Sequence, residues 1–423
     1  MTRVPRRGLL RGAAAAVGAG IAVAGARGVR TAGDARTPAT TPAAPGGTAP
    51  VGFHGPRQAA VLTRPRRATA FTAFDVTARD AGELTELLRT LTGRARFLTG
   101  GGVPEPLGIT APPSDSGLLG PQVPPDGGLL VTVGVGSSLF DGRFGLAGRA
   151  PRRLRPMPVF PDDDLRPDFC HGDLSVQLCA DSRDTVLHAL RDITRHTRGG
   201  LRVRWRVDGF TSPPRPTGTP RNLFGFKDGT SGPDPRDARQ TERLVWTDAR
   251  AGEPAWAAGG TYQVVRIIRM LVEFWDRIPL TEQQRILGRD RDTGAPLDGV
   301  HETDAPDYAR DPKGDVTPLD SHIRLANPRT PQTAQQQPLR RSYTYDRGTD
   351  SNGELDMGLL FCCYQRDPVG QFTAVQRRLA GEPLTDYVKP FGGGWFYVLP
   401  GVRDAADWYG RALLTTPGAT GER

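Results

Sequence analysis

The chain has 423 residues, of which 37% are hydrophobic and 24% are charged, and this composition is typical of a globular protein. This length allows two ordinary domains, or one large one, once a leader is set aside. The net charge of +9 includes four arginines within residues 1–26, which hold no acidic residue, so the rest of the chain carries +5. That remainder lacks a run of Lys and Arg interleaved with aromatic residues, so we expect no nucleic-acid partner.

Residues 1–26 have the pattern of an export signal. Arg6 and Arg7 precede Leu9 and a run of Ala, Gly and Val that ends near Ala26. We predict a twin-arginine signal peptide, recognised by the twin-arginine export machinery, and a secreted or cell-envelope location. An ordinary secretory leader or an uncleaved anchor are the alternatives. The apolar stretch is short and Gly-rich, so we expect no transmembrane segment in the mature protein. Residues 27–52, rich in Ala, Thr, Pro and Gly, predict a disordered linker.

The first half of the remaining chain predicts alternating strands and helices. The helix after the third strand has apolar residues at helical spacing, and Asp181 with Asp184 predicts its start. The predicted elements are a strand at 69–76, a helix at 81–91, strands at 128–135 and 174–180, a helix with Val186, Leu187, Leu190 and Ile193 on one face, and a strand at 201–207. This strand–helix–strand order, given twice, is the ferredoxin-like pattern.

The second half repeats the pattern around a long insertion. Its predicted elements are a long strand at 262–273, a short helix at 281–287, paired strands at 341–345 and 358–365, a helix at 369–379 with Phe372, Val375 and Leu379 on one face, and a strand at 394–399. The Pro-, Asp- and Gly-rich insertion, residues 288–337, carries His322. A loop of this length inside a compact domain is usually functional or disordered, and the histidine favours a functional loop.

We therefore predict an α+β fold of two ferredoxin-like domains, residues 53–215 and 216–415, whose antiparallel sheets pack together. An apolar cleft in the second domain would suit a flat cofactor.

Three polar side chains in the second half predict a site. Asp228 stands near Gly225 and before Gly229, where the backbone can turn sharply. Downstream come His322, and then Arg340, which cannot lose its proton. Each has an ordinary explanation: a core histidine, an Asp-Gly turn and a solvated arginine beside a second one. Together they supply a metal ligand, an acid/base group and a fixed cation, the parts needed to split a peroxide bond on iron.

These motifs resemble the dye-decolorizing peroxidases, of the exported deferrochelatase-like subgroup, over nearly the whole mature chain. The stretches that carry the resemblance are Phe53-His54-Gly55 with Gln58-Ala59, His171-Gly172-Asp173-Leu174, residues 222–230, residues 317–324 and residues 392–396. The G-x-x-D-G element at Gly225–Gly229 is the most specific of them. The resemblance implies a haem peroxidase that oxidises dyes, phenolics or similar small aromatic reductants with hydrogen peroxide in one-electron steps.

The resemblance also implies a role for each residue. Asp228 corresponds to the distal aspartate and His322 to the iron ligand, while Arg340, two residues before Ser342, corresponds to the distal arginine. Some relatives have Asn in place of Ser342. The remaining expected cofactor contacts are Phe226, Leu359 and Phe361, the last two over the distal haem face, and Arg324, which we expect to meet a carboxylate of haem with a forked hydrogen bond.

The cofactor is expected to be haem b in the C-terminal domain. Because the chain has no C-x-x-C-H motif, the haem would be held without thioether bonds. Cys170, Cys179, Cys362 and Cys363 form no C-x-x-C pair and are expected to be buried free thiols, with a Cys170–Cys179 disulfide left open.

The implied chemistry leads to two further expectations. Aspartate is a weaker base than histidine, with reference pKa values of ~3.9 and ~6.5, so activity should be highest in acid. Bulky dyes cannot reach a buried haem edge, so Tyr343, Tyr387 and Trp395 are candidates for electron transfer, with simple aromatic packing as the alternative.

Alternatives to the peroxidase remain. The protein could remove iron from haem with the porphyrin intact, or bind haem without turnover. It could also receive electrons from a copper protein, or serve an iron-uptake partner, neither of which the sequence tests.

Overall fold

A computed structural model describes residues 51–124, 128–248 and 252–415. The predicted signal peptide and most of the predicted linker lie outside these residues. Among the helices described, none is both long and apolar enough to cross a membrane.

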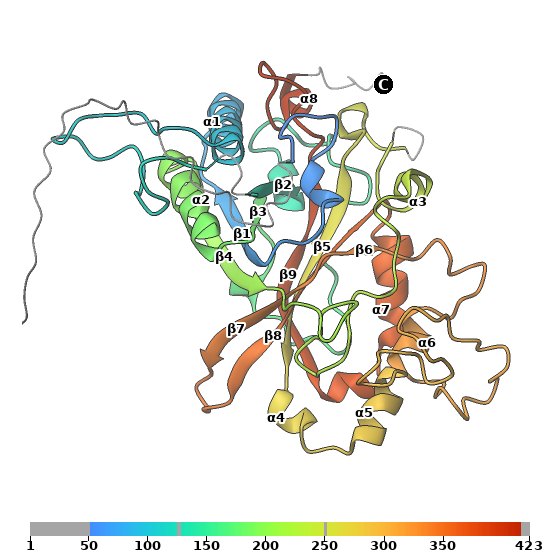
Figure 1. The fold of residues 1–423 in the computed structure, drawn as a ribbon. Coiled ribbons are helices and arrows are strands. Elements are labelled where there is room, and N and C mark those ends of the chain that lie inside the picture. Colours follow the sequence, from blue (N-terminus) through green and yellow to red (C-terminus); the bar gives the residue numbers. More distant parts are fainter. Residues whose placement is uncertain (1–50, 125–127, 249–251, 416–423) are drawn as a thin grey trace, which may run out of the picture. The chain divides into compact units, whose positions relative to one another are not determined.

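Nine strands in the described residues form one antiparallel sheet that closes on itself (Figure 1). They are β1 (Ala68–Val76), β2 (Leu130–Gly136), β3 (Leu174–Ala180), β4 (Leu201–Phe210), β5 (Thr261–Met270), β6 (Leu339–Arg340), β7 (Tyr343–Thr349), β8 (Leu355–Gln365) and β9 (Val388–Val398). The strand order is β5-β9-β2-β3-β1-β4-β7-β8-β6, and β5 also pairs with β8.

Each half of this sheet has the strand order of a ferredoxin-like unit. The first half runs β4-β1-β3-β2 and the second runs β9-β5-β8-β7, with every pairing antiparallel. This order arises when two strand–helix–strand units interlock, which is the pattern that the sequence predicts. The prediction of two ferredoxin-like units in an α+β fold is confirmed.

The two halves pack through their inner faces and join at both edges. β2 pairs with β9 along three residues, while β4 meets β7 only at Phe210 and Thr344. Between the sheets, Phe71 of β1 stacks on Trp205 with ring centroids 5.3 Å apart and lies 5.7 Å from Phe396 of β9. The core between the sheets therefore holds the halves together.

Eight helices in the described residues surround the two sheets. They are α1 (Ala81–Gly100), α2 (Arg183–His196), α3 (Ala238–Leu244), α4 (Val272–Trp275), α5 (Leu280–Leu287), α6 (His322–Ala326), α7 (Ala374–Leu379) and α8 (Arg411–Thr415). Figure 1 shows α1 and α2 beside the first half, and α5, α6 and α7 together beside the second. This second group, with the insertion, leaves room for a cavity against the sheet.

Several predicted boundaries are wrong: the helix predicted at 81–91 runs on to Gly100, and the strand predicted at 394–399 already begins at Val388. Ser182, not Asp181, caps α2 by accepting a hydrogen bond from the Asp184 amide, while Asp181 binds Arg66. The long strand predicted to reach residue 273 ends at Met270, because the apolar residues that follow form α4. The predicted helix at 369–379 begins as a π-helical turn, Val369–Thr373, and continues as α7.

The four cysteines are free and buried, as expected. Cys362 faces the core between the sheets, whereas Cys363 faces the opposite side of β8. Alternating directions along a strand explain this difference.

Candidate functional site

A cavity of about 310 Å³ lies on the outer face of the second sheet. Its walls come from β5, β8 and β9 on one side and from α5, α6, α7 and the Asp228 segment on the other. Its volume falls in the usual range for ligand and cofactor pockets. Phe372, Val375 and Leu379, predicted on one helical face, all line it.

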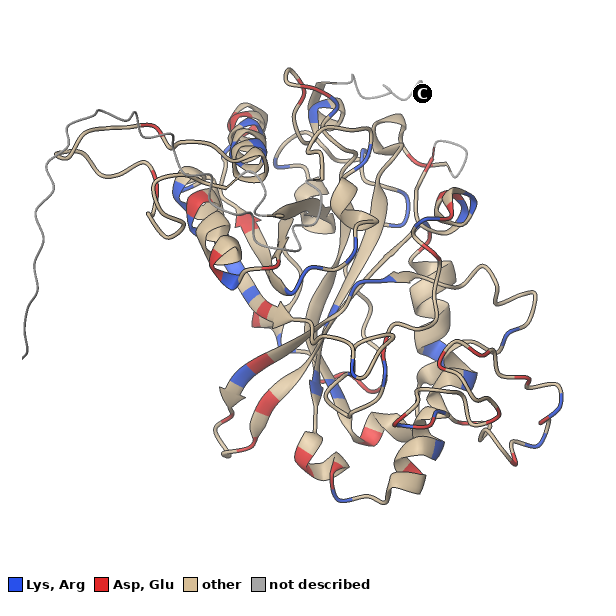
Figure 2. Ribbon diagram, viewed as in Figure 1, with Lys and Arg blue, Asp and Glu red and all other residues tan. Residues whose placement is uncertain are grey.

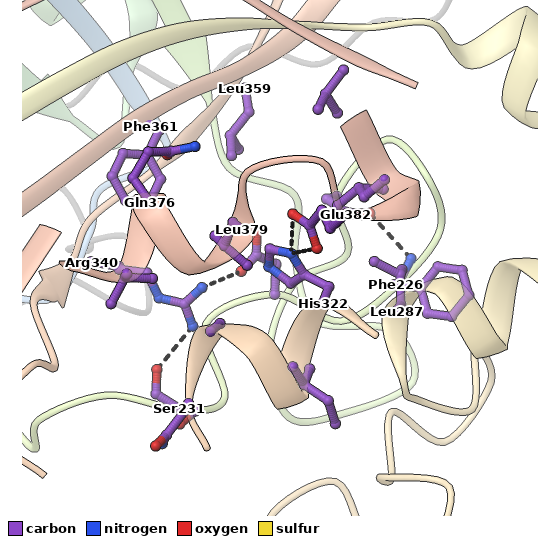
Figure 3. A pocket seen from close by; sticks show the side chains of 18 of the residues that line it. Phe226, Ser231, Leu287, His322, Arg340, Leu359, Phe361, Gln376, Leu379 and Glu382 are labelled. Carbon is purple, nitrogen blue, oxygen red and sulfur yellow. Dashed lines mark hydrogen bonds and ion pairs between the residues drawn. The ribbon is translucent and has the colours of Figure 1, made fainter. Parts of the chain in front are cut away.

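His322 is the first residue of α6 and lines this cavity. Its Nδ1 lies 3.0 Å from both carboxylate oxygens of Glu382, as Figure 3 shows. The Glu382 side chain is only 5% exposed, while that of His322 is 30% exposed. With Nδ1 engaged by a carboxylate, Nε2 is left as the nitrogen for a metal, an arrangement typical of metal-binding histidines.

The charge of Glu382 also affects the protonation of His322. Burial acts to lower the pKa of His322, but the negative charge of Glu382 and its hydrogen bond outweigh burial and raise that pKa above its usual value. The same carboxylate makes the ring a stronger electron donor when a metal replaces the proton.

Neighbouring segments fix the short helix that carries His322. Arg324 donates to the Thr317 carbonyl at 2.8 Å and forms an ion pair with Asp311 at 3.2 Å. From α7, Arg378 donates to the carbonyls of Leu325 and Ala326 at the end of α6. These contacts hold a five-residue helix that could not be stable alone.

Arg324 therefore does not lie in the cavity, where we expected it. Its guanidinium lies over the Tyr308 ring and on Asp311, and it does not line the cavity. Arg266, which is ion-paired with Asp163, does line the cavity, and so do two further arginines, Arg289 and Arg329. Neither forms an ion pair with any described residue, and burial together with the charges of Arg329 and Arg340 lowers the pKa of Arg289. This uncompensated positive charge fits an anionic group, such as a carboxylate of a cofactor.

Asp228 lies in the cavity wall, in a segment shaped by glycine. Gly225 and Gly229 both have left-handed φ angles, 82° and 108°, which other residues adopt only with strain. The Asn222 side chain accepts hydrogen bonds from the amides of Phe224 and Phe226, which fixes the turn before Asp228. The expectation of a sharply turned, oriented carboxylate is met.

Arg340 brings a fixed cation to this carboxylate. Its Nη1 donates to Asp228 Oδ1 at 3.2 Å, and its Nη2 donates to the Ser231 carbonyl at 2.9 Å (Figure 3). Both side chains are about one-third exposed, so each retains room to contact a small ligand. Ser342, two residues after Arg340, does not line the cavity.

Apolar residues form the remaining walls. Leu359 and Phe361 point from β8 into the cavity, because alternate residues of a strand share a face. Phe226 is 2% exposed and lines the cavity beside Trp275. These three expected contacts are brought together with His322, Asp228 and Arg340.

The electron-transfer candidates lie in different places. Tyr343 is buried between the two sheets, and Trp395 is buried in β9 under Arg155. Neither lines the cavity. Tyr387 instead packs edge-on against Trp275, with centroids 5.1 Å apart.

Tyr387 belongs to a set of aromatic rings between the surface and the cavity. On one side it stacks on Phe274, which is 49% exposed. On the other, Trp275 stacks on the cavity residue Phe224 at 4.4 Å. Of the three candidates, Tyr387 has the aromatic contacts that an electron route would use.

Glu382 is the main residue that the sequence analysis missed. It lies 60 residues after His322 in the chain, and its only local signal is its place between Gly381 and Pro383. Arg289 and Arg329 were also missed, because arginine is common throughout the chain.

The cavity fits haem by its donors and walls. His322 offers an oriented nitrogen, the apolar walls suit a porphyrin, and Arg289 and Arg329 suit its propionates.

Lys and Arg are interspersed with Asp and Glu over the described elements, as Figure 2 shows.

Comparison with known proteins gives matches over most of the chain. Family models described as Dyp-type peroxidase, N-terminal, and Dyp-type peroxidase, C-terminal, match residues 58–211 and 219–403. A deferrochelatase from Escherichia coli (strain 536) is 54% identical over 367 residues, which are 86% of each chain. Another, from Shigella sonnei, is 53% identical with the same coverage.

Solved structures are similar too. A DyP-type peroxidase from Cellulomonas bogoriensis has a TM-score of 0.78 and 38% identity, covering 88% of this chain and 100% of that one. Ferric DtpA from Streptomyces lividans has a TM-score of 0.78 and 35% identity, covering 88% and 98%.

Proposed function

This chain belongs to the Dyp-type peroxidase family and is an enzyme of the peroxidase class, and we propose that it uses hydrogen peroxide to oxidise dyes, phenolics or similar small aromatic reductants in one-electron steps. Haem is the cofactor of this family. We propose haem b, held without covalent bonds. The observation that supports this most is the pairing of an oriented histidine, His322, with an Asp228–Arg340 pair at one cavity.

In this proposal His322 would hold the haem iron through Nε2, and Glu382 would keep that ring in place through Nδ1. Arg289 and Arg329 would face the propionates, while Leu359 and Phe361 would exclude water from the porphyrin face. The bound haem would supply the redox chemistry, taking up the two oxidising equivalents of the peroxide.

Asp228 would move the proton. It would accept a proton from one oxygen of hydrogen peroxide and return it to the other oxygen, which would leave as water. Arg340, already 3.2 Å from Asp228, would stabilise negative charge on the departing oxygen without giving up a proton.

Electrons from bulky reductants would enter through aromatic side chains. We propose Tyr387 as the oxidisable surface-side residue and Trp275 as the intermediate, because their rings are in contact and Trp275 reaches the cavity wall. Tyr343 and Trp395 remain candidates: Tyr343 lies between the sheets, and Trp395 packs in one cluster with the cavity residue Phe372.

A second candidate function is release of iron from haem with the porphyrin intact. Its support is the name deferrochelatase, carried by relatives 53–54% identical to this chain. Anaerobic incubation with haem tests it, since released porphyrin would fluoresce. Binding of haem without turnover is disfavoured, because a carrier would not need the Asp228–Arg340 pair.

One sample tests the leading proposal. The purified protein should show a Soret band that changes on addition of peroxide and returns when a phenolic reductant is added. A Soret band that peroxide leaves unaltered would refute peroxidase activity and favour a carrier.

Export remains a proposal. The paired arginines near the N-terminus lie outside the described residues, so its support is the sequence pattern alone. Replacing both Arg6 and Arg7 with Lys should keep the protein inside the cell, as fractionation would measure.

A further inference from the structure

The carboxylate of Glu302 binds the chain on both sides of Asp228. Its Oε2 forms an ion pair with Lys227 Nζ at 2.6 Å, and its Oε1 accepts a hydrogen bond from the Thr230 hydroxyl at 3.0 Å. Oε1 also accepts from the Thr219 hydroxyl at 2.5 Å and from the Thr219 amide at 3.1 Å. One side chain thus ties together residues immediately before and two positions after Asp228.

Two glycines leave the space that the side chains of Lys227 and Glu302 occupy. A Cβ added at Gly218 would overlap the Glu302 carboxylate, and one added at Gly294 would press on the Lys227 side chain. Both glycines also have left-handed φ angles, 81° and 76°. Only glycine fits at either place without displacing the pair.

The ion pair between Lys227 and Glu302 is largely buried. The side chains of Lys227 and Glu302 are only 4% and 13% exposed. Burial acts to raise the pKa of Glu302, but the hydrogen bonds from Lys227, Thr219 and Thr230 outweigh it and lower that pKa below its usual value. The carboxylate is therefore charged and fully engaged, and breaking such a pair leaves a buried ion without a partner.

Glu302 also connects the segment that carries Asp228 to the rest of the cavity. Its backbone carbonyl accepts a hydrogen bond at 3.0 Å from Arg289, which lines the cavity. Glu302 belongs to the same insertion, residues 288–337, as His322. One insertion therefore provides the histidine nitrogen of the site and also holds the segment that carries the Asp228 carboxylate.

We infer that Glu302 is a positioning residue for Asp228: by binding Lys227 and Thr230 it fixes the direction of the Asp228 carboxylate without touching peroxide or haem. This inference rests on the proposed function, because it concerns the residue that would move the proton. A displacement of about 1 Å at a proton-transfer group costs on the order of 100-fold in rate, so orientation matters here.

The test uses holoenzyme carrying Glu302→Gln. Hydrogen–deuterium exchange should become at least ~10-fold faster in residues 221–230, where the Asp228 amide donates to the Pro220 carbonyl at 3.0 Å. The kcat/KM for hydrogen peroxide should fall ~10–100-fold, with haem content and Soret band unaltered. In an Asp228→Asn background, Glu302→Gln should change kcat/KM by less than about twofold. If Glu302→Gln does not fold, Thr230→Val tests the same contact with one hydrogen bond removed.

A matched control lies in the same insertion. Asp307 forms an exposed ion pair with Arg310 at 3.3 Å, so Asp307→Asn should alter neither exchange nor kinetics. Unaltered exchange in Glu302→Gln, or an equal loss of kcat/KM in both backgrounds, would overturn the inference. Failure of the proposed function is distinct: Asp228→Asn alone would then leave kcat/KM for peroxide unchanged.

Discussion

Glu382 offers the sharpest prediction about how the protein holds its metal. Replacing it with Ala removes the carboxylate that binds His322 Nδ1, while Glu382→Gln keeps a neutral acceptor of nearly the same shape. Both carboxylate oxygens lie 3.0 Å from Nδ1. No other described residue is hydrogen-bonded to that nitrogen. The ring would therefore lose its only oriented partner.

The contacts of Glu382 set the expected loss of haem affinity. Partners of metal-binding histidines contribute ~10–100-fold to metal affinity, or about 1.4–2.8 kcal/mol. Because Glu382 is buried and charged, we expect Glu382→Ala near the upper end. Glu382→Gln should lie near the lower end, since a neutral hydrogen bond is about half as strong as a charge-assisted one.

Titration of the apoprotein with haem measures the change in haem affinity directly. Potentiometry measures the reduction potential of the bound iron. Loss of the negative charge should raise the reduction potential, since His322 becomes a weaker donor. Glu354 pairs with Arg269 at 3.4 Å and is 60% exposed, so Glu354→Gln serves as the control. Haem affinity within twofold of wild type in Glu382→Ala, with an unchanged potential, would refute the role of Glu382.

Three further predictions concern other parts of the site. Arg329→Met should weaken haem binding about fivefold at low salt and less at high salt, because an exposed cation contributes up to about 1 kcal/mol to the free energy of binding and salt screens it. An equal loss of affinity at both salt concentrations would contradict a contact with a propionate. Tyr387→Phe should slow dye oxidation several-fold and spare peroxide reduction by a small reductant, and unchanged dye rates would remove the hopping route. The stabilisation from Glu302, whose pKa is lowered on folding, is fully present above its unfolded pKa of ~4.3 and is lost as pH falls through the lower folded value. Urea unfolding should therefore show wild type about 3 kcal/mol more stable than Glu302→Gln at neutral pH, a gap that narrows in acid; a constant gap would argue against the ion pair.

The fold was largely predictable because its strands are regular. Alternating and β-branched residues marked the strands of both halves, and their order with the helices implied the ferredoxin-like pattern. The strand end at Met270 was missed, since the apolar residues Val272 and Trp275 continue the run and short apolar runs do not separate strand from helix.

The site residues that belong to local sequence motifs were predictable. Those that reach the site only through contacts between distant parts of the chain were not. Asp228, His322 and Arg340 come together as their motifs implied. Arg324 was misplaced because α6 is helical: a residue two positions after His322 points roughly 200° around the helix axis, away from the cavity. Glu382 reaches His322 only through tertiary structure, and nothing local marks such a contact.

The most direct test is the absorption spectrum of haem-reconstituted His322→Ala. Binding of the iron by His322 predicts that this variant loses most of its haem, or keeps it with a shifted Soret band and altered ligand-field bands that added imidazole restores. Full haem content with an unshifted spectrum would contradict coordination by His322.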